Sequence, residues 1–145
     1  MATTDLVAEM ARMIFEHFAL NVPDARAMSE WYVKHLGFSV ARSREEAPYT
    51  RFLTDESGRV VVELYSNPSA RTLEFETEHP LTFHFAVVSR AADQDRSRLE
   101  QAGATFFVED RLPDGTQLIM LRDPWGVPVQ LCQRTNPFPD TGVNA

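Results

Sequence analysis

Two histidines and two side-chain oxygen donors recur at equal spacing in this 145-residue sequence. His17 begins His-Phe-Ala-Leu, and His84 begins His-Phe-Ala-Val 67 positions later. Glu63 and Gln130, each followed by leucine, are also 67 positions apart. Neutral imidazole, carboxylate and amide oxygen form a mixed nitrogen and oxygen set that suits Zn, Ni, Co, Mn or Fe(II). The spacing therefore predicts that these four residues ligate a divalent metal ion.

Strand alternation predicts that the four side chains point away from the helices. Residues i and i+2 of a strand share one face. If Leu20 packs beneath a helix, His17 faces the opposite side, and the same parity separates Leu64 from Glu63. The corresponding pair in the second half of the chain follows the same rule. The four donors are therefore expected to face one interior.

Each donor taken alone has a simpler explanation. A single inward histidine is usually a hydrogen-bonded core residue, and Glu63 has alternative partners in Arg51 and Arg122. However, a buried carboxylate is costly unless it is paired or binds a metal. The equal spacing in both halves favours a metal site, and four protein ligands leave open positions on a six-coordinate ion.

The elements around these residues repeat in the same order. Asp24 is a suitable N-cap for a helix, and Gly37 supplies the left-handed residue that ends it. An Asp-x-x-Gly turn precedes the last strand of each half, at 55–58 and 123–126. The predicted helices are 24–36 and 91–102; the predicted strands are 14–22, 38–42, 49–54, 60–65, 81–88, 105–109, 116–122 and 127–133.

Each half therefore predicts a βαβββ module, and the whole chain an α+β fold. A module of about 55–60 residues is near the size at which a domain alone is marginal, so each must have its sheet face covered. The single domain 1–145 would comprise a helix at 1–13, modules at 14–66 and 81–133, a connector at 67–80 and a loose tail at 134–145.

Composition excludes several classes of protein. With 14 basic and 21 acidic residues the net charge is −7, which disfavours nucleic acids and anionic membranes as partners. No stretch approaches the ~20 apolar residues of a membrane span. The one cysteine, Cys132, offers no intrachain disulfide, and no signal-peptide pattern is present. A cytoplasmic protein is therefore expected.

Further motifs surround the donors, and together they identify a family resemblance. They are His17-Phe-Ala-Leu-Asn-Val-Pro-Asp24, Trp31-Tyr32 before Leu36-Gly37-Phe38, Val62-Glu63-Leu64-Tyr65, His84-Phe-Ala-Val, Ala102-Gly103-Ala104, and Asp123-Pro-Trp-Gly126 leading to Val129-Gln130-Leu131. The sequence resembles the vicinal oxygen chelate superfamily, which includes glyoxalase I, methylmalonyl-CoA epimerase, bleomycin-resistance proteins, fosfomycin-resistance transferases and extradiol dioxygenases. The resemblance spans roughly residues 14–133 and is specific for the superfamily, not for one activity.

This resemblance implies two βαβββ modules that form an open, cup-shaped barrel around a divalent metal. It also implies a homodimer, in some members with modules exchanged between chains. The family's metal positions correspond to His17, Glu63, His84 and Gln130 in this sequence.

Gln130 is where the sequence departs from several members of the family. Glyoxalase I has two glutamates among its ligands, and this chain keeps only Glu63. Methylmalonyl-CoA epimerase resembles the set in having two histidines, one glutamine and one glutamate, but its glutamine lies in the first module. Fosfomycin transferases and extradiol dioxygenases have a glutamate at the last strand, so Gln130 disfavours both activities.

The resulting hypothesis is a metal-dependent isomerase or lyase of the glyoxalase type. It would act on a small substrate with vicinal oxygens through an enediolate-type intermediate, with Glu63 as the base. The expected substrate-binding residues are Arg51, Tyr65, Arg122 and Trp125. No residue of this sequence demands a glutathione moiety.

The alternative is a metal-free ligand-binding or drug-sequestration protein of the bleomycin-resistance type. Its groove would be lined by Phe15, Tyr49, Tyr65 and Trp125. A complete set of four ligand-type residues disfavours this alternative, because a metal-free protein does not require it. Elemental analysis of the purified protein separates the two hypotheses.

Overall fold

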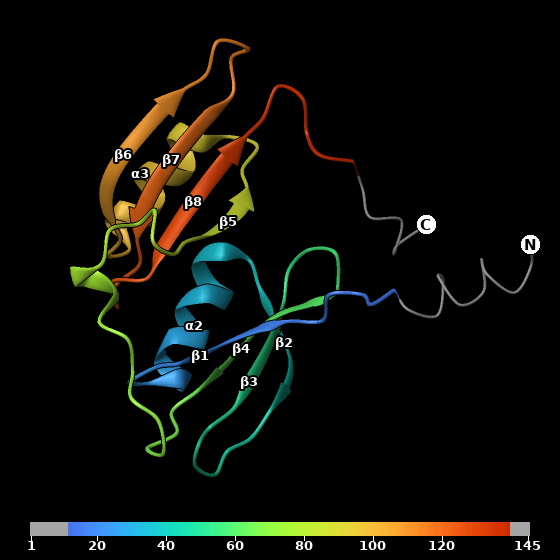
Figure 1. Ribbon diagram of the computed structural model, residues 1–145, viewed down its shortest axis with the longest axis vertical. Coiled ribbons are helices and arrows are strands. Elements are labelled where there is room, and N and C mark those ends of the chain that lie inside the picture. Colours follow the sequence, from blue (N-terminus) through green and yellow to red (C-terminus); the bar gives the residue numbers. More distant parts are fainter. Residues whose placement is uncertain (1–11, 140–145) are drawn as a thin grey trace, which may run out of the picture. The chain divides into compact units, whose positions relative to one another are not determined.

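The computed structural model describes residues 12–139 (Figure 1). Most of the predicted helix at 1–13 and the end of the predicted tail therefore lie outside the described residues. The α+β class and the two βαβββ repeats are confirmed. The elements are β1 (Phe18–Asn21), α2 (Ala25–Leu36), β2 (Ser39–Ser43), β3 (Arg51–Thr54), β4 (Val60–Tyr65), the 3-10 turn η1 (Phe75–Thr77), β5 (Phe85–Val88), α3 (Ala92–Gln101), β6 (Thr105–Arg111), β7 (Gln117–Arg122) and β8 (Pro128–Gln133).

The chain divides into two compact units, Met1–Arg71 and Thr72–Ala145. Each unit has one four-stranded sheet, with strand order β1-β4-β3-β2 in the first and β5-β8-β7-β6 in the second. The first and last strands of each unit are parallel neighbours, and the other pairings are antiparallel. Ala19 pairs with Glu63, and Ala86 pairs with Gln130, so the two units share the same register.

In unit 1, α2 covers one face of the sheet (Figure 1). The apolar face of α2 packs against the apolar face of the sheet. The side chains that are fully buried there include Met28 and Tyr32 of α2 and Leu64 of β4. The predicted caps are present. The Asp24 carboxylate accepts the Ala27 N–H at 3.0 Å, and Gly37 adopts φ 73°.

In unit 2, α3 packs on β7 and β8, and its buried side chains are few. Leu99 lies with Ile119 and Leu131 in the core of this unit. No side chain caps α3 from the N-cap residue Ala91. The Gln133 side chain instead accepts the N–H of the first helical residue at 2.8 Å.

The first strand of each unit is shorter than predicted and does not include its histidine. β1 begins at Phe18 and β5 begins at Phe85, so each histidine lies one residue before its strand. Ahead of β5 the backbone turns instead, because the Thr82 N–H donates to the His79 carbonyl at 2.8 Å. Within residues 12–139, no helix is long and apolar enough to cross a bilayer.

Candidate functional site

His17 and Glu63 lie on the sheet face of unit 1 that is opposite α2. Glu63 pairs with Phe52 of β3 across the antiparallel ladder, so these two side chains share a face. The His17 ring meets the Phe52 ring edge-on, with centroids 5.5 Å apart. The structure therefore brings His17 to the same face as Glu63, beside a common aromatic neighbour.

The His17 imidazole is oriented by its sequence neighbour. Its Nδ1 lies 2.8 Å from a Glu16 carboxylate oxygen. A carboxylate only accepts, so Nδ1 carries the hydrogen and Nε2 of the neutral ring keeps its lone pair. Metal-ligating histidines are commonly held this way, with the other ring nitrogen donating to a carboxylate or carbonyl.

The Glu63 carboxylate is half-buried in β4. Among residues 12–139, no hydrogen bond or ion pair reaches it. Arg51 does not neutralise it, because Arg51 pairs with Leu64 and so belongs to the opposite face. The Arg51 guanidinium donates to the Arg44 carbonyl at 2.6 Å and lies 3.3 Å from a Glu45 carboxylate oxygen.

His84 and Gln130 form the corresponding pair in unit 2. His84 Nδ1 donates to the Pro80 carbonyl at 3.0 Å, which again leaves the Nε2 lone pair of the neutral ring available. The Gln130 side-chain oxygen accepts from Cys132 Sγ at 3.4 Å. Burial raises the pKa of the Cys132 thiol, which keeps this donor protonated. The amide oxygen retains one further lone pair.

Of the other predicted substrate-binding residues, Tyr65 belongs to unit 1, and Arg122 and Trp125 belong to unit 2. Arg122 pairs with Pro128 and so shares the face of Gln130, but its guanidinium donates to the connector carbonyls of Phe75 at 2.6 Å and Glu78 at 2.7 Å. Trp125 lies in the turn between β7 and β8. Tyr65, in unit 1, is half-buried at the end of β4.

The donor types in each unit fit a divalent metal. Each unit has one imidazole whose Nε2 keeps its lone pair and one side-chain oxygen, the ligands that borderline divalent ions accept. In the part of the chain that the structure describes, no three His, Cys, Asp or Glu side chains gather closely enough to hold an ion.

A pocket of about 580 Å³ opens beside His17 in unit 1. We call it the Phe52 pocket. Of the four aromatic residues that the sequence predicted for a binding groove, only Phe15 lines this pocket. Strict alternation assigns Val60 to the helix side. A register irregularity between Leu53 and Thr54 turns Val60 to the Glu63 face instead. The walls of the pocket include Phe15, Ala41, Arg42, Phe52, Arg59 and Val60.

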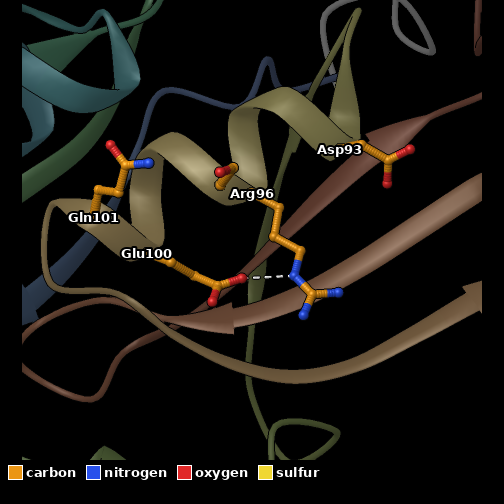
Figure 2. Close-up of a pocket in the computed structure, with 5 residues that line it drawn as sticks. Asp93, Arg96, Glu100 and Gln101 are labelled. Carbon is orange, nitrogen blue, oxygen red and sulfur yellow. Dashed lines mark hydrogen bonds and ion pairs between the residues drawn. The ribbon is translucent and has the colours of Figure 1, made fainter.

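A second depression, of about 560 Å³, runs along α3. Figure 2 shows the side chains of Arg96 and Glu100 directed toward each other. Their ion pair measures 2.6 Å from Arg96 Nε to a Glu100 carboxylate oxygen. Its remaining lining residues are Asp93, Ser97 and Gln101, which all belong to the same helix. Because Arg96 is paired within the helix and lies 3.5 Å from the Phe106 ring centroid, this depression is a charged outer helix face.

The family model that matches this chain is the Glyoxalase/Bleomycin resistance protein/Dioxygenase superfamily, over residues 14–131. No curated protein matches the chain in sequence.

Solved structures of enzymes and of an antibiotic binding protein share this fold. A glyoxalase I mutant from Zea mays is 19% identical with a TM-score of 0.70; the match covers 94% of this chain and 50% of that one. TnmS3, an antibiotic binding protein from Streptomyces, is 18% identical with a TM-score of 0.64, covering 87% and 99%. A lactoylglutathione lyase from Agrobacterium tumefaciens is 19% identical with a TM-score of 0.60, covering 85% and 95%.

Proposed function

The chain belongs to the Glyoxalase/Bleomycin resistance protein/Dioxygenase superfamily, and on that premise we propose that it is a metal-dependent lyase or isomerase. Its substrate is a small molecule with vicinal oxygens. The observation that carries the proposal is the repeated donor pair. In each unit a histidine with a free Nε2 accompanies a side-chain oxygen at the same strand register.

The proposed metal ligands are His17, Glu63, His84 and Gln130. A bound divalent ion would supply a Lewis acid that holds the two substrate oxygens and stabilises negative charge between them. Glu16 and the Pro80 carbonyl hold the two imidazoles in the tautomer that such ligation needs.

Glu63 is the proposed general base. It is the only carboxylate in the proposed ligand set, and no described residue neutralises it. It would remove the proton from the carbon beside the substrate carbonyl and return a proton to the neighbouring carbon. Gln130 cannot substitute for it, because an amide does not accept a proton at neutral pH.

Deuterium exchange provides the test. Protein loaded in turn with Zn, Ni, Co and Mn is incubated with dihydroxyacetone in D2O, and incorporation at carbon is followed by proton NMR. We expect exchange in the wild type and a loss of at least about 100-fold in Glu63→Gln. Glu30→Gln, an exposed glutamate of α2, is the matched control and should exchange normally. Full exchange in Glu63→Gln would refute this role for Glu63.

A metal-free binding protein is the second candidate, and the Phe52 pocket favours it. Phe15 and Phe52 present aromatic surface there, as expected for a small-molecule pocket. Elemental analysis after purification in metal-supplemented medium separates the candidates. A divalent ion that is lost in His17→Ala supports the enzyme, whereas metal-free protein that binds an aromatic ligand supports the second candidate.

We also propose that the protein is a cytoplasmic homodimer. Light scattering coupled to gel filtration tests the dimer directly, because the mass of one chain is 16.5 kDa. A mass of one chain across the accessible concentration range would contradict it.

A further inference from the structure

The Phe52 pocket carries an excess of positive charge on an acidic protein. Its lining contains two arginines, Arg42 and Arg59, and one carboxylate, Glu16. The chain as a whole has a net charge of −7. A local reversal of sign inside a concave site attracts ligands of the opposite charge.

The two arginines are available to a ligand to different degrees. Arg59 donates to the Phe15 carbonyl at 2.5 Å, which holds the segment before β1 against the pocket. A guanidinium has five N–H donors, so most of those on Arg59 remain. Arg42 is exposed, and within residues 12–139 nothing bonds to its guanidinium.

The floor of the pocket is apolar and adjoins the proposed base. Arg42, Phe52 and Glu63 follow one another across three neighbouring strands at paired positions. Paired side chains on one face have Cβ atoms about 4.5–5.5 Å apart. A ligand lying over Phe52 would therefore have one end near Glu63 and the other near the arginines.

We infer that the Phe52 pocket binds a small organic anion with an apolar or aromatic body, whose carboxylate pairs with Arg42 and Arg59. Phe52 and Val60 contact the body, and the guanidinium groups donate charge-assisted hydrogen bonds to the carboxylate. The inference rests on the proposed function, since it names the substrate class of the same site. A volume of about 580 Å³ is adequate for a molecule of this kind.

The test compares a carboxylate with its neutral isostere on the full-length, EDTA-treated protein. Amide NMR spectra are recorded during titration with 3-phenylpropionate and, separately, with 3-phenylpropanamide. We expect shifts at Phe52 and Val60, a Kd at least fivefold lower for the acid than for the amide, and weakening of the acid alone by added salt. Equal affinity for the two probes, or no saturable shift at these residues, overturns the inference.

Two variants assign the charge to the pocket. Arg42→Gln should weaken the acid about tenfold, while leaving the amide unchanged. The control is Arg44→Gln, an exposed arginine outside the pocket that pairs with Glu46 at 3.7 Å. Wild-type affinity in Arg42→Gln, or an equal loss in Arg44→Gln, would contradict the assignment.

Comparing this titration with the deuterium-exchange assay distinguishes a failure of this inference from a failure of the proposed function. The titration uses EDTA-treated wild-type protein and needs neither metal nor turnover, so its outcome does not depend on the exchange assay. If deuterium exchange is never observed but the acid still binds selectively, the proposed function fails and the pocket assignment stands. If exchange occurs and the probes bind equally, only the pocket assignment fails.

Discussion

The two units place a histidine and an oxygen donor at the same strand register but surround them differently. In unit 1, Glu63 is half-buried, has no polar partner among residues 12–139, and adjoins a pocket with two arginines. In unit 2, Gln130 accepts from a buried thiol and pairs with Met120, which is itself buried. The oxygen donor of unit 1 is therefore a carboxylate beside a pocket with two arginines, whereas that of unit 2 is a neutral amide already bonded to a thiol.

The backbone of the repeat is preserved even where the side chains differ. A side chain at the end of the last strand accepts the N–H of the first helical residue in both units, Ser66 for Ala25 at 2.9 Å and Gln133 for Ala92 at 2.8 Å. These pairs are offset by the same 67 positions as the donors. Hydrogen bonding of the helix ends constrains both units alike, whereas the pocket chemistry has diverged.

Exchanging the two oxygen donors should have the largest effect. The double variant Glu63→Gln with Gln130→Glu keeps one carboxylate and one amide, so the ligand types are unchanged. We expect it to retain metal and to show a deuterium-exchange rate that is about 10²–10⁴-fold lower. The reason is that the carboxylate then lies at position 130, in unit 2, and no longer beside the Phe52 pocket. Exchange at the wild-type rate would show that the two units are chemically equivalent.

Core truncation should affect both units strongly. Leu64 and Leu131 occupy corresponding strand positions, with 0% and 2% exposure. Each change to alanine leaves a cavity and should lower the free energy of unfolding by about 2–5 kcal/mol. Urea denaturation followed by circular dichroism measures both variants. A loss below about 1 kcal/mol in either would indicate that its helix does not pack on its sheet as described.

Changes to the helix N-caps should alter the free energy of unfolding by a smaller amount, and with opposite sign in the two units. Asp24 caps α2, whereas the corresponding residue, Ala91, gives α3 no side-chain cap. Asp24→Ala should cost about 1 kcal/mol, and Ala91→Asp should add a few tenths to about 1 kcal/mol. Thermal unfolding of both variants checks the two signs. A stability loss in Ala91→Asp would mean that the Gln133 side chain already fulfils the capping role.

The Cys132 thiol should give the smallest effect, seen as a shift in a pH profile. Burial raises its thiol pKa, so the reactive thiolate forms at higher pH than in an unfolded chain. Alkylation by iodoacetamide should be slow near pH 8 and should accelerate only at more alkaline pH. The urea-unfolded protein is the control. Equal rates in the folded and unfolded protein at pH 8 would contradict the burial of this residue.

Local signals predicted the fold well, and long-range geometry explains what they missed. Asp24, Gly37 and the repeated register of Glu63 and Gln130 follow from capping and strand alternation, which are short-range effects. The turned position of Val60 depends on a register irregularity between two strands, which no periodicity within one strand reveals.

The sequence alone did not reveal which partners the arginine side chains select. Arg51 and Arg122 were both possible ion-pair partners of Glu63. In the structure Arg51 donates to a loop carbonyl, and Arg122 donates to connector carbonyls. The sequence shows that an arginine is present, but its five N–H donors can reach many acceptors. Which acceptor it bonds depends on the loop carbonyls that the tertiary fold brings close.

Metal stoichiometry tests the central claim most directly. The wild type, His17→Ala, His84→Ala and the control His79→Ala are dialysed against a divalent metal and analysed by inductively coupled plasma mass spectrometry. His79 lies in the turn before β5 and outside the donor set. We expect about one tightly bound ion per chain in the wild type and in His79→Ala, and a loss of the ion in both His17→Ala and His84→Ala. Metal-free wild type, or an ion retained at full stoichiometry and affinity in either donor variant, would contradict the central claim.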